Sequence, residues 1–333
     1  MRILLGAALT AVVLSGCGAP AAPVTAEPSP TEIPSQLALP AHPTGQVWRA
    51  LALVPADAEV VTLTDFDTIR ARFGVPEMTS DDLMADRSAF WERVRSDAVV
   101  LTDGLLAADH SRFWLDHGFT EDDVDWEVRF TGPEGAGYVV AFRPGLPMAR
   151  VEGALVEKAL AGVTVMADQH LLVKGVAREG DAVWASDPAL PDLTDSGAES
   201  AYLRRGCVPV RTALGEDATA EDQATLVGEL DPRNLGDLPA FSVSFADGLA
   251  TARFGAERAD LVERVAITRA WPVIRSAPGF TDGFRPEVLD DPSTGRIGLR
   301  PKAPYAAAAV TLDDLLPFAI CNSVEPVEEP TGL

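Results

Sequence analysis

Cysteine and histidine are the residues of this sequence whose types and spacing bear most on chemistry. The chain holds three cysteines, Cys17, Cys207 and Cys321, and four histidines. No two cysteines have the C-x-x-C spacing of a redox or zinc motif, and the zinc motif H-E-x-x-H is absent. The serine motifs G-x-S-x-G and S-x-x-K are absent as well. We therefore predict no catalytic residue, no metal site and no cofactor from motifs.

Two histidines, His110 and His117, lie seven residues apart in a segment that we expect to be helical, 103–118. A metal pair or a pH-sensing pair is one interpretation. Zinc ligands on one helix are usually four residues apart, however, and seven residues correspond to about 10 Å of helical rise. We therefore expect two partly buried helix histidines without a metal.

Carboxylates are abundant, and four of them lie close together in the segment 121–125. This cluster lacks the alternating ligands and the glycine of an EF-hand loop, so we expect a solvated turn and not a calcium site. Two carboxylates elsewhere could act as an acid and base pair, but the sequence does not place any two face to face.

The elements that must position these residues alternate between hairpins and helices. In the first half we expect strands at 58–64, 125–130, 138–142, 163–167, 170–176 and 181–186, with helices at 65–73, 80–94, 103–118 and 147–160. In the second half we expect helices at 221–229 and 257–270, strands at 241–245, 249–254, 296–300 and 305–311, and a short last helix that carries Cys321.

Hairpins outnumber parallel crossovers in this pattern, which predicts an α+β fold with a largely antiparallel sheet. Both halves show a hairpin, a helix and a second hairpin, a pattern that suggests either an internal duplication or two related α+β layers. We place the first α+β half at 46–190, the second at 200–322 and a loose acidic tail at 323–333. The segment 201–239 gives mixed signals, and we assign it only the helix at 221–229.

The N-terminal residues MRILLGAALTAVVLSGC combine one arginine, a short apolar run and small residues before a cysteine. The end of this segment, Leu14-Ser15-Gly16-Cys17, resembles the lipobox of bacterial lipoproteins. That resemblance implies a signal peptide at 1–16, acylation of Cys17 with fatty acids such as palmitate, and a lipid anchor on the extracytoplasmic face of the cell membrane. An ordinary secretory signal that is cleaved elsewhere, or an uncleaved anchor, remains an alternative.

The segment 17–45 follows the acylated cysteine and is rich in proline. It has no apolar periodicity, so we expect a semi-extended linker between the membrane and the folded body.

An exported protein occupies an oxidising compartment, in which thiols tend to pair. If Cys17 is lipidated, Cys207 and Cys321 remain, and we predict a disulfide between them. The bond would close a loop of about 115 residues, which the chain-entropy model rates at roughly 4–5 kcal/mol of stability. Two separate buried thiols are the alternative.

The composition limits the class of partner. The chain has 333 residues, 47% of them hydrophobic, and 50 acidic against 27 basic residues give a formal net charge of −23. The apolar fraction is typical of a globular protein. The acidic excess argues against nucleic acid as a partner, because phosphates would be repelled.

The leading hypothesis is a lipid-anchored extracytoplasmic protein that binds an envelope protein or a small ligand, or is otherwise associated with the envelope, without catalysis. One alternative is an envelope hydrolase that uses paired carboxylates. Another is a substrate-binding lipoprotein of a transporter, although the hairpin-rich pattern differs from the parallel sheets of such proteins. The body of the sequence resembles no characterised family.

Overall fold

A single antiparallel sheet organises the folded body. The computed structural model describes residues 45–102, 104–178, 180–215, 217–255, 258–273 and 279–324. The predicted signal peptide, the predicted lipidation site Cys17, nearly all of the predicted linker and most of the acidic tail lie outside these described residues. Within them the sheet has ten strands, β1 (Val60–Asp65), β2 (Val124–Gly132), β3 (Gly135–Phe142), β4 (Thr164–Met166), β5 (Leu171–Lys174), β6 (Ser200–Arg205), β7 (Ala240–Ala246), β8 (Leu249–Arg253), β9 (Phe284–Asp291) and β10 (Arg296–Pro301).

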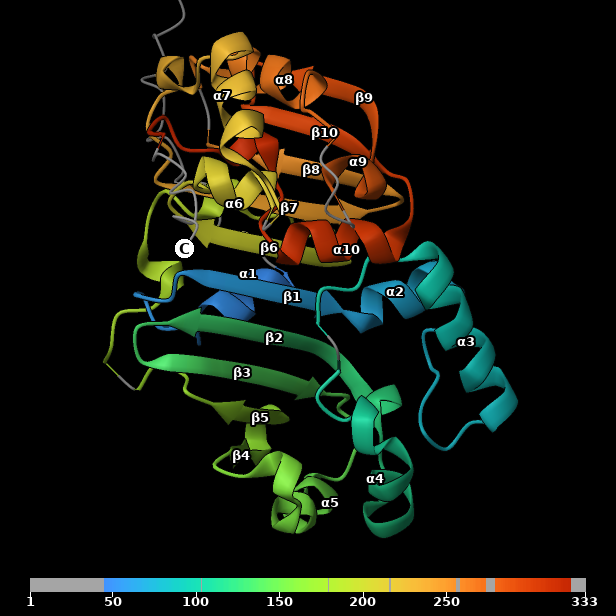
Figure 1. The fold of residues 1–333 in the computed structure, drawn as a ribbon. Helices are drawn as coiled ribbons and strands as arrows, with labels where there is room; N and C mark the ends of the chain where they lie inside the picture. The colour runs from blue at the N-terminus through green and yellow to red at the C-terminus, as the bar shows by residue number, and fades with distance from the viewer. Residues whose placement is uncertain are drawn as a thin grey trace, which may run out of the picture. The chain divides into compact units, whose positions relative to one another are not determined.

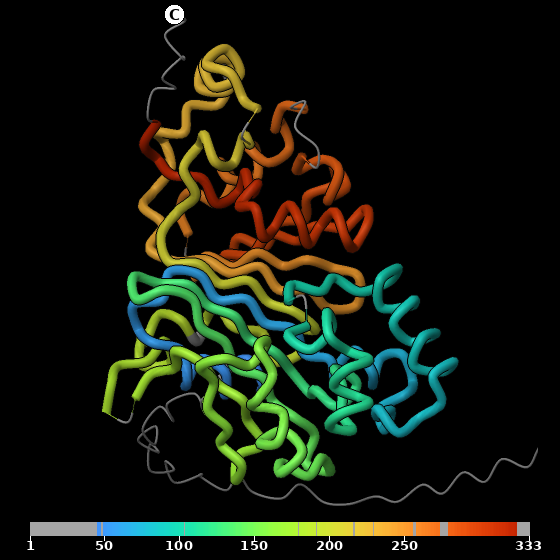
Figure 2. Tube along the Cα trace, turned by 60° about the horizontal axis from the view of Figure 1, so that its bottom comes forward, coloured from blue at the N-terminus to red at the C-terminus, as the bar shows by residue number. Residues whose placement is uncertain are grey.

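The strand order repeats on either side of the sheet's centre. The order is β4-β5-β3-β2-β1-β6-β7-β8-β10-β9, and every neighbouring pair is antiparallel. Counted outward from the centre, the two halves have the same strand order, β1-β2-β3-β5-β4 in the first and β6-β7-β8-β10-β9 in the second. In both halves the last strand along the chain lies inside the strand that precedes it. The two halves meet at the pair β1–β6, whose register runs from Val60 opposite Arg204 to Thr64 opposite Ser200 (Figures 1 and 2).

Helices follow the first and third strands of each half. The helices are α1 (Gln46–Leu51), α2 (Phe66–Arg72), α3 (Met84–Asp97), α4 (His110–His117), α5 (Met148–Gly153), α6 (Val210–Leu214), α7 (Ala220–Glu229), α8 (Leu261–Arg269), α9 (Phe280–Gly283) and α10 (Pro304–Leu312). Helices α2 to α4 follow β1, and α6 and α7 follow β6. Helix α5 follows β3, and α8 and α9 follow β8. The predicted hairpin, helix and hairpin units are therefore present in both halves.

Three apolar clusters pack against the sheet. One joins α2 to α5 with side chains such as Val140 and Leu172, and a second joins α6 to α10 with side chains such as Phe241 and Val243. The third covers the opposite face of the first half, where α1 and the segment that includes Trp184 pack on side chains such as Val61. Because both faces of the central strands are covered, β1 and β6 are buried almost throughout.

Local sequence signals explain several element boundaries. The Asp65 carboxylate accepts a hydrogen bond from the backbone of Thr68 at 2.9 Å and caps α2. Asp247 and Gly248, at φ 48° and 71°, form the tight turn between β7 and β8. An Asp-Gly pair at positive φ is the strongest short-range hairpin signal, and here the prediction is confirmed.

Three expectations about elements are wrong, and two strands were not predicted. Residues 305–311 form helix α10 and not a strand, because Pro304 occupies the first helical turn and a run of alanines follows. Strand β10 forms its hairpin with β9, an edge strand whose Pro286 hides the strand signal. The central strand β6 lies in the segment with mixed signals. Residues 184–186 form a short 3-10 turn, and Cys321 follows such a turn instead of lying within a helix.

Among the described helices, none combines the length and the apolarity that crossing a bilayer requires.

Candidate functional site

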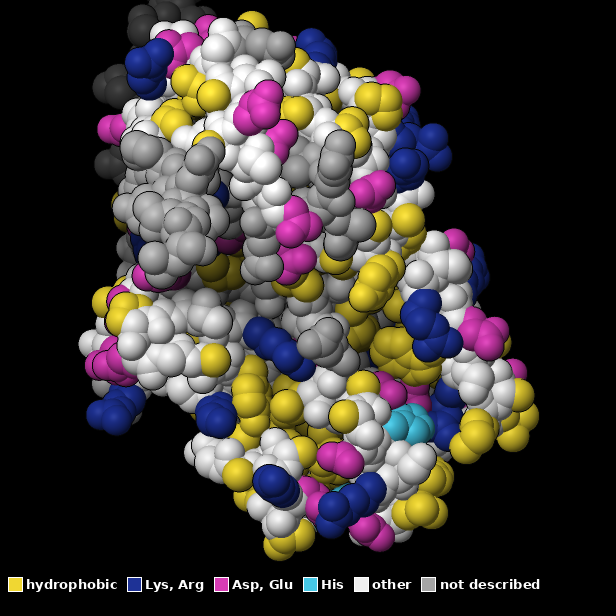
Figure 3. Space-filling view, in the orientation of Figure 1, with side chains coloured by type: hydrophobic (Ala, Val, Ile, Leu, Met, Phe, Trp, Pro, Cys, Tyr) yellow, Lys and Arg dark blue, Asp and Glu magenta, His cyan; other side chains and the backbone are white. Residues whose placement is uncertain are grey.

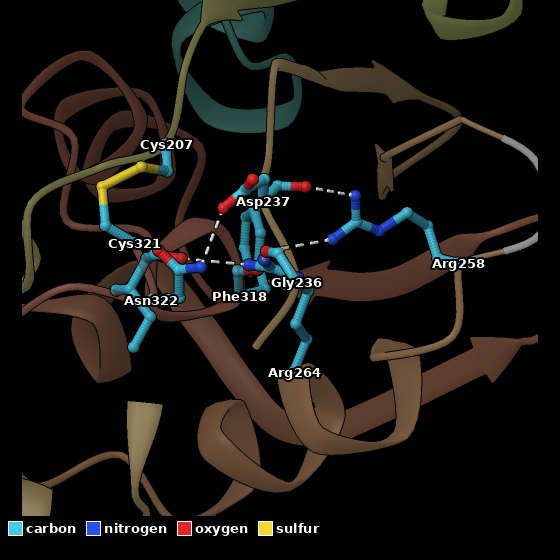
Figure 4. Close-up of a disulfide and its surroundings, with 9 residues drawn as sticks. Cys207, Gly236, Asp237, Arg258, Arg264, Phe318, Cys321 and Asn322 are labelled. Carbon is cyan, nitrogen blue, oxygen red and sulfur yellow. Dashed lines mark hydrogen bonds between the residues drawn. A yellow bond between two sulfur atoms is a disulfide. The ribbon is translucent and has the colours of Figure 1, made fainter. Parts of the chain in front are cut away.

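The predicted disulfide is present. Cys207 and Cys321 are bonded, with their Cα atoms 4.9 Å apart. The bond holds the chain just after β6 against the C-terminal segment, where Val208 forms an isolated parallel bridge with Ile320. Figure 4 shows the bond and its surroundings.

A buried arginine ties the same C-terminal segment to α8. Arg264 is fully buried and donates to the carbonyls of Phe318 at 3.0 Å and Ile320 at 3.1 Å. It also donates to the carboxylate of Asp260 at 2.9 Å. Asn322 continues this fastening through a 2.9 Å hydrogen bond to Asp237. The disulfide and these bonds act together as a structural clasp rather than a reactive site.

The candidate binding site is a cavity of about 470 Å³ beside helix α3. One face of α3 forms a wall of this cavity, because its lining residues recur every three or four positions. The α3 residues in the wall are Met84, Arg87, Ser88, Trp91, Glu92 and Arg95. The remaining wall comes from the loop after α3, from the start of α4 and from the turn at 121–122. Figure 3 shows hydrophobic, acidic and histidine side chains together at this hollow between α3 and α4.

Trp91 is held firmly within the cavity wall. Its indole Nε1 donates to Asp122 Oδ1 at 2.7 Å. Its ring makes edge contacts with Phe66 and Phe90, at centroid distances of 5.6 and 5.1 Å. The side chain is nevertheless only half-buried, although it lies next to these two buried rings. The cavity therefore contains an aromatic surface whose orientation is fixed before any ligand arrives.

The acidic cluster at 121–125 is largely buried and hydrogen-bonded to the surrounding protein. The expectation of a solvated turn is therefore wrong. Asp122 is 0% exposed and Asp123 is 5% exposed. Thr120 and Asp123 form a capping box around the short 3-10 turn. Besides its bond to Trp91, Asp122 accepts hydrogen bonds from Arg87 at 2.7 Å and from the Thr120 hydroxyl at 2.9 Å. Burial of these acids became possible because distant arginines and backbone amides satisfy them, which spacing alone does not reveal.

The last acid of the cluster, Asp125, belongs to a neighbouring arginine network. Its carboxylate lies 3.1 Å from the fully buried Arg70 and 3.7 Å from Arg143. Burial raises the pKa of Asp125 to about 6, against the opposing effect of these two positive charges. The neutral form of this acid is therefore favoured well above the pH at which an exposed aspartate ionises.

Two other acids at the junction of the halves are perturbed in the same direction. Burial raises the pKa of Glu199, even though Arg72 lies 2.8 Å away. Burial also raises the pKa of Asp314, which accepts hydrogen bonds from the Tyr202 hydroxyl and, at 2.6 Å, from Arg204. Each acid links segments that are far apart in the sequence.

The two helix histidines do not meet. His110 Nδ1 lies 2.8 Å from Glu121, at the cavity wall, whereas His117 Nε2 lies 3.1 Å from Glu157. In the part of the chain that the structure describes, no group of three histidine, cysteine or acidic side chains is arranged to hold a metal ion. Each histidine instead fastens one end of α4 to a different segment.

Comparison with known proteins adds little. No protein-family model matches this sequence, and no curated protein matches it. Crystal forms III and I of TP0453 each align with a TM-score of 0.30 and 8% identity, covering 80% of this chain and 98% and 97% of theirs. Similarity at that level supports no inference about fold or function.

The sequence offered only a weak signal for this cavity. Trp91 sits at an apolar position of the predicted helix, next to Phe90, and such a residue usually belongs to the core. Trp91 differs from a core residue because the other residues on its face of the helix are polar, with Arg87, Ser88 and Arg95 at helical spacing. Only the fold brings Asp122 close enough to anchor the ring.

Proposed function

We infer that this chain is a lipid-anchored extracytoplasmic binding protein without catalytic activity. The observation that carries the proposal is the lipobox-like segment that ends at Cys17, in a chain whose other two cysteines are joined in a disulfide. A disulfide of this kind persists in an oxidising compartment, which supports the exported location that the N-terminal segment implies.

The binding site in this proposal is the cavity beside α3. Its volume of about 470 Å³ lies within the range of small-molecule sites. It combines an anchored aromatic ring with a few polar side chains, which is the usual composition of a ligand pocket. The ligand would enter a site that is already formed, so little ordering of the protein opposes binding.

Asp122 is not suited to the acid or base role that the hydrolase alternative requires. A glycoside hydrolase needs two carboxyl groups that are free to exchange a proton or attack the substrate. Both oxygens of Asp122 accept hydrogen bonds, one from Trp91 and the other from Arg87 and Thr120. We therefore assign this carboxylate to holding the wall of the site.

Metabolic labelling tests the anchor. Cells that express the wild-type chain and a Cys17→Ala variant are supplied with a radioactive or clickable palmitate analogue. We expect label in the wild type alone, and we expect the variant to lose its membrane association. A Cys207→Ala/Cys321→Ala variant is the matched control, because it also lacks cysteines but should still be labelled. Equal membrane association of wild type and Cys17→Ala would contradict the proposal.

A further inference from the structure

The charges around the cavity beside α3 limit the class of ligand. Arg87 and Asp122 form a buried ion pair at 2.7 Å and largely neutralise each other. The remaining charged lining residues are Arg95, Glu92 and Glu121. The two glutamates disfavour an anionic ligand, and Arg95 offsets part of their attraction for a cationic one. The lining therefore has no concentrated charge of one sign that would hold a strongly charged ligand.

The same wall offers both donors and acceptors of hydrogen bonds. Ser88 and Thr102 carry hydroxyls, Arg95 donates, and Glu92 accepts. Ser88, Glu92 and Arg95 are exposed side chains of this wall, so their hydrogen-bonding groups are accessible to a ligand.

The anchored indole supplies the remaining requirement. Trp91 is oriented by Asp122, Phe66 and Phe90, and its partly buried side chain lines the cavity. An indole ring has a flat apolar face that carries a partial negative charge. A partner for this surface needs an apolar face of its own. The polar side chains around the indole require that the edge of the same ligand carry several groups that donate and accept hydrogen bonds.

We propose that this cavity binds a neutral saccharide, with one pyranose ring stacked on Trp91. The C–H face of a pyranose packs on the indole, and its ring hydroxyls reach Ser88, Glu92 and Arg95. Such a ring is uncharged, apolar on one face and rich in donors and acceptors at its edge, which matches the three properties of the wall. The assignment rests on the binding role proposed above and names the class of ligand.

The test is a titration of the mature lipidated protein in a detergent that contains no sugar. Cellotetraose, maltotetraose and tetra-N-acetylchitotetraose are the neutral probes, and benzoate and benzyltrimethylammonium are the charged aromatic probes. Tryptophan fluorescence and saturation-transfer NMR follow binding. We expect at least one neutral saccharide to bind saturably, and we expect neither charged probe to do so.

Matched variants locate the binding. Ser88→Trp places a bulky ring in the cavity from an exposed position of α3, so it should lower the affinity for saccharide at least tenfold without unfolding the protein. Ala89→Trp adds the same ring at the next position, outside this cavity, and should leave the affinity unchanged. Trp91→Phe keeps a smaller ring and should weaken binding by about threefold, while Trp91→Ala should weaken it at least tenfold.

The outcomes separate the two proposals. Binding of a charged probe alone, abolished by Ser88→Trp, would overturn the saccharide assignment but leave the binding role of the cavity intact. Failure of all five probes to give a signal that depends on Ser88 would overturn both the saccharide assignment and the cavity as the binding site. Saccharide binding that Ser88→Trp leaves unchanged would overturn the saccharide assignment at this cavity.

Discussion

At the residue scale, both carboxylate oxygens of Asp122 accept hydrogen bonds from the surrounding protein. Arg87, Trp91 and Thr120 donate to it from a helix and from its own turn. Arg87 is 5% exposed, so loss of its partner would leave a positive charge buried without compensation. Removal of one partner from a buried pair of this kind is much more costly than removal of a surface charge.

The first prediction concerns this pair. Asp122→Ala should lower the free energy of unfolding by about 3–5 kcal/mol, since Arg87 stays buried and unpaired. Asp122→Asn, which keeps the shape of the side chain, should cost less than Asp122→Ala. Urea denaturation followed by circular dichroism measures both.

The control is Asp116→Ala, which removes an acid from an exposed pair with Arg112 at 3.8 Å. That variant should change stability by less than about 0.5 kcal/mol. Equal unfolding midpoints for Asp122→Ala and Asp116→Ala would show that the Asp122 carboxylate does not stabilise the fold.

The second prediction concerns pH. Burial raises the pKa of Asp125 to about 6 in the folded chain, whereas an unfolded aspartate has a pKa of about 3.9. Between these values the folded state holds the proton more tightly than the unfolded state does. Asp125 therefore stabilises the fold at pH 4 relative to pH 7, and this contribution is lost as the pH rises through 6.

Unfolding free energies at pH 4 and pH 7 measure the effect. The free energy of unfolding should fall less from pH 4 to pH 7 in Asp125→Asn than in wild type, by about 1–2 kcal/mol. This figure is smaller than the full linkage between the two pKa values because the side chain is partly exposed. Asp116→Asn should leave the decrease unchanged. If the free energy of unfolding depended on pH in the same way in wild type and in Asp125→Asn, the raised pKa of Asp125 would be contradicted.

At the element scale, the disulfide and Arg264 fasten the same C-terminal segment by different means. The disulfide joins residues 114 positions apart, so reduction frees a long loop in the unfolded chain. Arg264 acts only in the folded state, through the carbonyls of Phe318 and Ile320. Because the arginine contacts do not depend on the disulfide, we expect the segment to remain docked after reduction.

The third prediction follows from that difference. Cys207→Ser/Cys321→Ser should lower the free energy of unfolding by about 2–4 kcal/mol and leave the native circular dichroism spectrum unchanged. Hydrogen exchange of the amides at 317–321 should accelerate more than that of the strands. A variant as stable as wild type would contradict the stabilising role of this bond.

Local signals decided which elements could be predicted. The Asp-Gly turn fixed the hairpin of β7 and β8, and Asp65 marked the start of α2. The strands β6 and β9 were missed for different reasons. Strand β6 ends in two arginines, and β9 carries Pro286. The alanines of α10 were overlooked because their valine and threonine neighbours favour a strand.

At the scale of the whole molecule, the two halves share one sheet, and their strands follow one scheme. The sequence suggested a repeated pattern of hairpins and helices, but it did not reveal that β1 and β6 pair at the centre. That pairing depends on tertiary contact between segments about 140 residues apart, as in Thr62 opposite Tyr202. The candidate cavity was hidden for the same reason, since residues from four separate segments form it: Phe66, α3, the stretch 100–110 and the turn at 121–122.

The central claim places this body outside the cell, attached through lipid at Cys17 and closed by one disulfide. The intact mass of the protein purified from cell membranes without reductant tests that claim most directly. We expect a chain that begins at Cys17, carries the added mass of a diacylglycerol with or without a third acyl chain, and lacks two hydrogens at Cys207 and Cys321. A chain that begins at Met1 with three free thiols would contradict it.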